Sequence, residues 1–281
     1  MNAIETRGLS KYYDGFSLER IDLTLPGGTI MGLIGENGAG KSTLIKCLLG
    51  IIKPSLGEAK LLGLPTEQAL GQVGYVPDEC PFSDALKVRQ VGAFLPGIFP
   101  DWDKDLWAEY LKKFELPVDR KVKELSRGMK MKLTIAAALA HRPKLLILDE
   151  ATSGLDPVVR DEILDEFLAF ISDEEHAVLI SSHITSDLEK ICDYVTYLHK
   201  GKLTVQGPKD ELLERYGKVA CTKDQLAQIN PAILVGKREG EYGCQALVSD
   251  RAALRRSCHD LEADRCTLED IMIFTTRGDR K

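Results

Sequence analysis

A glycine-rich segment between two apolar stretches constrains the fold of this 281-residue chain more than any other feature. Residues 30–34 form an apolar run of strand length. Residues 41–49 carry leucines four apart and precede Gly50, which is typical of a helix and its stop. The residues between are Gly-Glu-Asn-Gly-Ala-Gly. The sequence therefore predicts a strand, a glycine loop and a helix in direct succession.

Two further apolar runs, residues 145–148 and 177–180, are typical of strands buried on both faces. Such strands occur in parallel sheets that helices cover on both sides. Between these runs, Asp156 can cap a helix that begins at Pro157, and apolar residues follow at helical spacing. The predicted fold class is therefore α/β.

The character of the chain changes between Asp78 and about Ala140. Residues 103–116 place leucine, tyrosine and phenylalanine side chains on one side of an amphipathic helix. We therefore predict a helical subdomain over about residues 78–140, within a core domain of residues 1–208.

The last part of the chain has the pattern of a small accessory domain. Residues 232–235 and 244–248 are typical of strands on either side of a glycine-rich turn. Thr267 and Asp270 have the spacing of a helix capping box. We expect a small α+β domain over residues 209–281.

Charge, cysteine content and hydropathy exclude several classes of protein. Lys and Arg number 37 against 43 Asp and Glu, so a net charge of −6 offers no general attraction for nucleic acid. The seven cysteines are scattered without a C-x-x-C pair, which argues against zinc and a disulfide framework. The longest apolar runs fall far short of the roughly 20 residues that a membrane span needs, and no secretory signal is recognised. We expect a cytoplasmic protein that does not itself cross a membrane.

The glycine loop fits the phosphate-binding pattern G-x-x-x-x-G-K-[ST] in the strand-to-helix context that this pattern requires. Its glycines expose backbone amides to phosphate oxygens, and the following helix directs its positive end at the same anion. Lys41 would neutralise the β- and γ-phosphates, and the Ser42 hydroxyl would hold Mg²⁺. The expected ligand-binding residues are Gly35, Glu36, Asn37, Gly38, Ala39, Gly40, Lys41, Ser42 and Thr43.

Two carboxylates follow the apolar run of residues 145–148. They would lie at the carboxyl end of a strand, where open α/β sheets bind ligands. Asp149 would reach the magnesium ion, directly or through water, and Glu150 would take the proton from an attacking water. Acids at a strand end are common, but together with the phosphate-binding loop they indicate a nucleotide-hydrolysing site.

The order of these motifs resembles the ATP-binding cassette (ABC) ATPases, a family with the P-loop NTPase fold. The resemblance covers roughly residues 1–208. The segments that carry it are residues 35–43, Leu-Ser-Arg-Gly-Met at 125–129, residues 145–150, Ser-Gly-Leu-Asp at 153–156 and His183. It implies a P-loop NTPase core, ATP and Mg²⁺ as cofactors, and a second ABC ATPase subunit, identical or a sister chain, arranged head to tail.

The resemblance also implies further site residues. Ser126, Arg127 and Gly128 open an alanine-rich helix whose N-terminus would contact the ATP held by the partner subunit. Asp156 would lie in the loop that bridges the subunits. His183 would contact the γ-phosphate and the attacking water as a switch.

For the aromatic residue that stacks on adenine, the resemblance leaves two candidates. Tyr13, in Lys-Tyr-Tyr-Asp at residues 11–14, resembles the family's adenine-stacking residue. Tyr12 is a competing candidate, and the sequence does not choose between them.

Three positions depart from the family pattern. Asp78 follows Gly-Tyr-Val-Pro where many members carry a glutamine that contacts metal and water. An aspartate can still bind Mg²⁺, but it adds a negative charge beside phosphate. Arg127 and Met129 replace a glycine and a glutamine of the usual signature. We expect ATP binding to be retained, with altered contacts to the partner subunit.

A narrower resemblance suggests the biological setting. Pro-Asp-Trp-Asp at residues 100–103 and Leu-Glu-Asp-Ile at residues 268–271 are similar to the YtrB-like ATPases of Gram-positive bacteria, which serve ABC-2-type exporters. This resemblance implies an ATPase that powers a separate membrane-spanning permease for export and binds peripherally to the inner face of the plasma membrane through it. The accessory domain could be a scaffold, a regulatory element or a support for the dimer.

Two other functional classes fit less well. A soluble ABC ATPase that acts on nucleic acid or the ribosome generally carries two cassettes or a long coiled coil, and the short span from Ser42 to Ser126 has no space for such an arm. A small-molecule kinase would use the same loop but has no need of Asp156 or His183.

Overall fold

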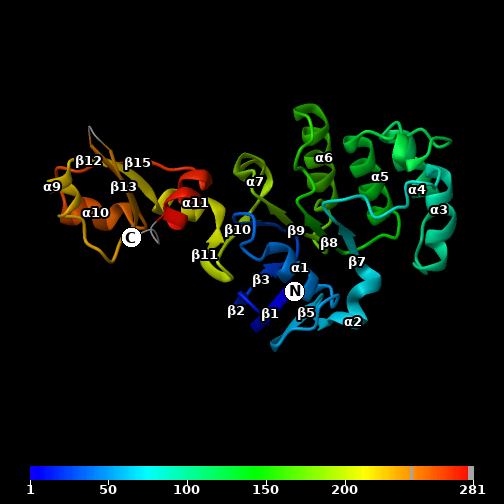
Figure 1. The fold of residues 1–281 in the computed structure, drawn as a ribbon, viewed down its shortest axis with the longest axis horizontal. Helices are drawn as coiled ribbons and strands as arrows, with labels where there is room; N and C mark the ends of the chain where they lie inside the picture. The colour runs from blue at the N-terminus through cyan, green and yellow to red at the C-terminus, as the bar shows by residue number, and fades with distance from the viewer. Residues whose placement is uncertain (241–242, 278–281) are drawn as a thin grey trace.

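The central element of the computed structural model, which describes residues 1–240 and 243–277, is a mostly parallel sheet (Figure 1). Its strand order is β11 (Lys202–Pro208), β10 (Tyr194–His199), β4 (Ile30–Ile34), β9 (Ala177–Ser182), β8 (Leu145–Asp149) and β7 (Val73–Val76). All neighbouring pairs are parallel except β10 with β11. Every residue of β4, β8 and β9 is buried, so the predicted α/β class with doubly covered strands is confirmed.

Alternate residues of the central strands serve two different cores. Met31 and Leu33 pack toward the N-terminal half of the chain, whereas Ile30 and Ile34 pack toward the helices on the other face. This alternation follows from the two-residue period of a β-strand. Figure 1 shows α1 (Lys41–Leu48) and an antiparallel sheet on one side of the central sheet, and α5 (Arg127–Leu139), α6 (Pro157–Phe170) and α7 (Thr185–Ile191) on the other.

The antiparallel sheet is not predicted from the sequence. It contains β1 (Asn2–Tyr13), β2 (Phe16–Ile21), β3 (Thr24–Pro26), β5 (Leu56–Leu61) and β6 (Leu64–Pro65). The pairing of β1 shifts register against each of its three neighbours. These irregularities interrupt the alternation of buried and exposed residues that would have indicated a strand.

The stretch predicted as a helical subdomain contains α3 (Val88–Phe94), α4 (Lys104–Lys113) and α5. The predicted amphipathic helix of residues 103–116 is confirmed as α4 over Lys104–Lys113, and Asp103 caps it by accepting hydrogen bonds from the amides of Asp105 and Leu106, both at 2.9 Å. The helix ends earlier than predicted, since Glu115 has a φ of 52°, outside the helical range. The remaining short helices of the core are α2 (Thr66–Ala69) and the 3₁₀ turns Leu70–Gln72, Leu95–Gly97 and Val122–Glu124.

Residues 209–281 are here called the C-terminal segment. Its described part, residues 209–240 and 243–277, begins with α8 (Lys209–Arg215) and contains a separate antiparallel sheet (Figure 1). Its strand order is β13 (Leu234–Glu239), β14 (Cys244–Val248), β12 (Gly217–Cys221) and β15 (Ala263–Arg265), and its helices are α9 (Lys223–Leu226), α10 (Arg251–Ser257) and α11 (Leu268–Arg277).

The two predicted C-terminal strands have different outcomes. Residues 244–248 are confirmed as β14. The prediction for residues 232–235 is wrong at its start, because Asn230 accepts hydrogen bonds from the amides of Ala232 and Ile233 and holds them in a turn. The strand therefore begins at Leu234.

The last helix returns to the core domain. Thr267 and Asp270 bond each other's backbone amides reciprocally at 3.1 Å, which confirms the predicted capping box. Leu268 and Phe274 of α11 then enter the same hydrophobic cluster as Leu188 of α7. In the part of the chain that the structure describes, no helix is both long and apolar enough to traverse a bilayer.

Candidate functional site

The phosphate loop, residues 35–43, connects the end of β4 to α1 and is pressed against neighbouring strands. A Cβ atom on Gly35 would lie 2.5 Å from the carbonyl oxygen of Leu198. Gly40 has a φ of 110°, and a Cβ atom there would lie 2.7 Å from the ring of Phe16. Glycine is therefore needed at both positions, by close approach at the first and by backbone conformation and close approach at the second.

Lys41 lies beneath this loop with only 5% of the residue exposed. Its Nζ donates a hydrogen bond to the carbonyl oxygen of Gly35 at 2.7 Å and lies 3.0 Å from Glu150 Oε1. The ammonium group is thus fixed at the centre of the loop, with a carboxylate as its partner. An arriving phosphate would offer it a second anionic partner.

Asp149 and Glu150 point in different directions from the end of β8. Asp149 is 3% exposed, and its Oδ1 accepts a hydrogen bond from Ser181 Oγ at 2.7 Å. Glu150 has a φ of 54°, and its amide donates to the carbonyl oxygen and the Oγ of Ser181, both at 3.1 Å. A positive φ is uncommon for a non-glycine residue, so Ser181 on β9 holds Glu150 in a strained turn.

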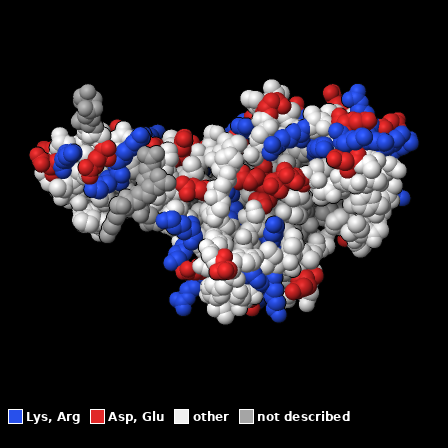
Figure 2. Space-filling model, viewed as in Figure 1, with Lys and Arg blue, Asp and Glu red and all other residues white. Residues whose placement is uncertain are grey.

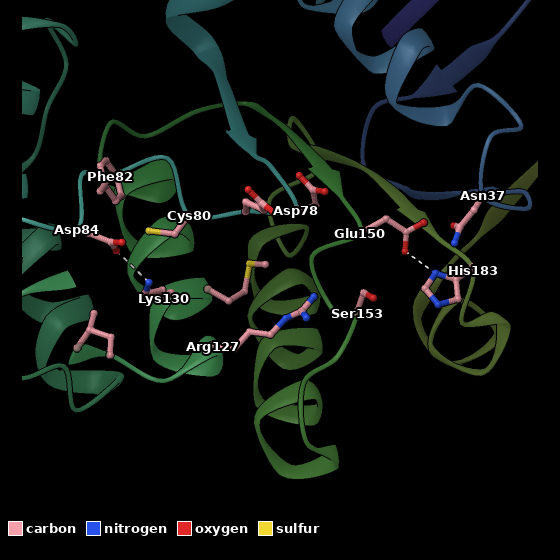
Figure 3. Close-up of a pocket in the computed structure, with 13 residues that line it drawn as sticks. Asn37, Asp78, Cys80, Phe82, Asp84, Arg127, Lys130, Glu150, Ser153 and His183 are labelled. Atoms are coloured by element: carbon pink, nitrogen blue, oxygen red, sulfur yellow. Dashed lines mark hydrogen bonds and ion pairs between the residues drawn. The ribbon is translucent and has the colours of Figure 1, made fainter. Parts of the chain in front are cut away.

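Glu150 contacts two basic side chains at once. Its Oε2 lies 2.7 Å from Nδ1 of His183 (Figure 3). Its other oxygen, Oε1, is the one that contacts Lys41. The side chain of Glu150 is 16% exposed, whereas that of His183 is 44% exposed. The imidazole therefore lies between the carboxylate and solvent, where a ligand would enter.

The phosphate loop borders a cavity of about 530 Å³, here called the loop cavity. Its lining residues are Phe16, Glu36, Asn37, Gly38, Gly40, Lys41, Ser42, Thr43, Asp78 and Glu150. Asp78 follows β7 and lies opposite the loop residues. Burial and the charges of Asp149 and Asp78 raise the pKa of Tyr75 to about 12, which indicates that both aspartates lie close enough to Tyr75 to act on the same phenol.

The three predicted magnesium ligands are Ser42, Asp78 and Asp149. No group of three or more His, Cys, Asp or Glu side chains that could hold a metal is present among the described residues. Mg²⁺ is commonly held by one or two carboxylates together with phosphate oxygens and water. Ser42 and Asp78 line the loop cavity, where a hydroxyl and a carboxylate could hold a Mg²⁺ ion that arrives with a nucleotide, whereas Asp149 lines neither this cavity nor the larger one described below.

A larger cavity, of about 740 Å³, separates the phosphate-loop side from the helical stretch (Figure 3). Asp78, Glu150 and His183 line it together with Arg127 at the start of α5. Ser126 caps α5 by accepting a hydrogen bond from the amide of Met129 at 3.2 Å. Ser126 and Gly128 contribute to neither cavity, so within one chain these two residues are not brought to the phosphate loop.

Asp156 of the predicted bridging loop and the two candidate aromatic residues line neither of the two cavities. Asp156 caps α6 by accepting hydrogen bonds from the amides of Val158 and Val159 at 3.2 and 3.1 Å. Tyr12 and Tyr13 are 51% and 45% exposed.

Two site residues escape the sequence analysis. Phe16 pairs with Tyr13 across the β1–β2 hairpin and lines the loop cavity, so it is a further candidate to contact a base. Ser181 holds both Asp149 and Glu150. Ser181 could have been found from its position at the end of an apolar run. Phe16 could have been found from its proximity in sequence to the two tyrosines.

Comparisons with known proteins agree on one family. The family model described as ABC transporter matches residues 18–153. The ABC transporter ATP-binding protein YtrB of Bacillus subtilis is 33% identical over 234 residues, which cover 82% of this chain and 80% of that protein. The bacitracin transport ATP-binding protein BcrA of Bacillus licheniformis is 35% identical over 242 residues, covering 83% and 78%. Among solved structures, the ATP binding subunit of an ABC transporter matches with a TM-score of 0.69 and 26% identity, over 75% of this chain and 92% of that one.

Proposed function

The chain belongs to the ABC transporter family, and from this premise we propose that it is the ATP-binding and ATP-hydrolysing subunit of an exporter whose membrane-spanning permease is a separate chain. The observation that carries the proposal is the contact chain from Lys41 through Glu150 to His183 beside the phosphate loop. In this chain Lys41 would be the cation that binds phosphate, Glu150 the general base and His183 the partner of that base. Export is supported by relatives that are named for bacitracin transport and Nod factor export.

The proposed hydrolysis depends on the residues that already contact one another. The amides of the phosphate loop and Lys41 bind the β- and γ-phosphates, which positions the γ-phosphate toward Glu150. Glu150 accepts the proton of the attacking water, and His183 orients its carboxylate through the 2.7 Å contact. Ser42, Asp78 and Asp149 would hold Mg²⁺, which neutralises phosphate charge when it is bound.

A second ABC ATPase subunit, identical or a sister chain, completes the proposed site. In this arrangement Ser126, Arg127 and Gly128 of one subunit contact the nucleotide of the other. Support comes from the start of α5, where a capping serine leaves helix amides at an anion-binding terminus. Asp156 lies in the loop that would face the partner.

The proposed permease is of the ABC-2 type, and it holds the chain at the inner face of the plasma membrane. Phe94 and Ile98 support a docking role for the helical subdomain of about residues 78–140, because they are 42% and 61% exposed. We assign the ATPase core to residues 1–208 and the accessory domain to residues 209–281.

Nucleic acid is not expected as a partner. Figure 2 shows Lys and Arg intermixed with Asp and Glu on the face that it displays, with a prominent acidic group near the centre of the molecule. The net charge of −6, together with the acidic side chains that lie among the basic ones on this face, disfavours binding to phosphate backbones.

The direct test is phosphate release by the purified chain with ATP and Mg²⁺, followed by co-purification with the permease. We expect hydrolysis by the chain and its recovery in a detergent-solubilised complex. A chain that binds no ATP in calorimetry would contradict the ATPase assignment. Recovery of active ATPase without any membrane protein, from cells that express the neighbouring genes, would instead contradict the permease assignment.

Replacing Asp78 with glutamine is expected to strengthen ATP binding by about tenfold, equivalent to about 1.4 kcal/mol. Glutamine keeps an oxygen for Mg²⁺ but removes a negative charge that lies in the same cavity as Lys41 and Ser42. The measurement is the dissociation constant of ATP with Mg²⁺. Asp84→Asn is the matched control, because Asp84 lines only the larger of the two cavities and is paired with Lys130. Equal affinities for the wild type and Asp78→Gln would show that the charge has no effect on binding.

A further inference from the structure

The first residue of the C-terminal segment and the start of its last helix both meet the core domain at Glu189 on α7. At the start of the segment, Lys209 Nζ donates a hydrogen bond to the carbonyl oxygen of Glu189 at 2.8 Å. Near its end, the amide of Leu268 donates to Glu189 Oε1 at 2.5 Å. One half-buried residue thus binds the first residues of both α8 and α11 through its main chain and its side chain.

Apolar packing reinforces these two hydrogen bonds. Leu188 and Ile191 of α7 are 0% and 4% exposed, and they belong to the same hydrophobic cluster as Leu268, Ile271 and Phe274 of α11. In addition, the Tyr197 hydroxyl on β10 donates to the carbonyl oxygen of Met272 at 3.2 Å. The C-terminal segment is therefore packed against α7 rather than merely tethered to the core.

The other side of α7 is fixed to α6. Arg160 Nε lies 3.7 Å from Asp187 Oδ2, and Lys190 forms an ion pair with Asp161. Figure 1 shows α7 between α6 and α11. A seven-residue helix held on both sides moves as one unit, so a shift of α11 relative to the core would displace α7.

The N-terminus of α7 lies two residues after His183. The intervening turn is closed by a hydrogen bond from the amide of Ile184 to Ser182 Oγ at 2.9 Å. His183 has an exposed imidazole whose place is set by this short turn and by its 2.7 Å contact with Glu150. The position of the imidazole therefore depends on the position of α7.

We propose that the C-terminal segment positions His183 through α7, and that Glu189 is the positioning residue. Loss of the Glu189 side chain leaves the amide of Leu268 without its acceptor at the start of α11 and removes one of the two hydrogen bonds that anchor α7. The helix and the turn that carries His183 can then shift away from Glu150. The effect on hydrolysis rests on the proposed function, whereas the effect on the position of His183 does not.

The first experiment compares Glu189→Ala, Glu189→Gln and Lys218→Met in steady-state ATP hydrolysis. We expect Glu189→Ala to lower kcat by about 3- to 30-fold, the range of couplings carried through packed elements, with the KM for ATP nearly unchanged because the phosphate loop is untouched. Glutamine keeps an acceptor oxygen and should restore most of kcat. Lys218→Met is the control, because it breaks the 2.9 Å ion pair with Asp270 on α11 but leaves Glu189 intact.

Epistasis separates positioning from general destabilisation. If Glu189 acts through His183, Glu189→Ala should cause no further loss of activity in a His183→Ala chain. If the double variant instead loses activity by the product of the two single losses, the proposal is overturned. A failure of Glu189→Gln to restore kcat would overturn it too.

A measurement without turnover completes the test. The imidazole resonances of His183 in the nucleotide-free protein are assigned by their absence in His183→Ala. We expect them to shift in Glu189→Ala, to return in Glu189→Gln and to stay unchanged in Lys218→Met. Unshifted resonances in Glu189→Ala would overturn the proposal even if hydrolysis were lowered. A wild type that hydrolyses no ATP would contradict the proposed function while these resonances still decide the positioning role.

Discussion

Glu150→Gln is expected to lower ATP turnover by about 10² to 10⁴, the contribution of a positioned general base. Glutamine has nearly the same shape as glutamate but cannot accept the proton of the attacking water. ATP binding should persist, because Lys41 is freed from its 3.0 Å ion pair with Glu150 and remains available to phosphate. A nucleotide-bound dimer should therefore accumulate. Single-turnover hydrolysis, together with size-exclusion chromatography in ATP, measures both effects.

The matched control is Glu79→Gln, which makes the same chemical change in the larger of the two cavities. Its turnover should remain close to that of the wild type, because Glu79 does not line the cavity at the phosphate loop. Normal turnover in Glu150→Gln would remove Glu150 from the role of base. A loss in both variants would indicate that the overall charge of the cavity, rather than proton transfer, limits the rate.

Local signals in the sequence predict the centre of the fold. The strand, loop and helix around Gly35 and Lys41 are consecutive, and each has its own signature in apolar runs, glycines and helical spacing. The same holds for the buried strand before Asp149 and for the helix that Asp156 caps. Each of these elements can be recognised without knowledge of its partners.

Features that depend on partners distant in sequence are not predicted. The strand β1 contains Glu5, Arg7 and Lys11 and shifts register against its neighbours, so its burial follows from the sheet rather than from its own pattern. Ser181 reaches Asp149 only because β8 and β9 are adjacent in that register. Glu189 meets an amide 79 residues further along the chain. Tertiary pairing determines these contacts, and the local sequence pattern does not indicate which distant segments pair.

Lys41→Ala is expected to weaken ATP binding by two or more orders of magnitude. A charge-assisted hydrogen bond is worth roughly 1.5 to 3 kcal/mol, and the buried ammonium of Lys41 is positioned to make one with each of the two terminal phosphates. The variant also leaves Glu150 without its 3.0 Å cationic partner, so the carboxylate adds repulsion toward phosphate. Titration calorimetry with ATP and Mg²⁺ measures the loss.

Two companion variants assign that loss to the ammonium group. Lys41→Met keeps most of the volume of the side chain and should weaken binding as much as alanine does, since charge rather than packing is removed. Lys46→Ala, on the exposed face of the same helix, should bind ATP as the wild type does. Thermal unfolding of all three variants shows whether the fold is retained. Wild-type affinity in Lys41→Met would mean that the loop amides alone hold the phosphates, and that the ion pair with Glu150 serves the architecture of the site rather than the ligand.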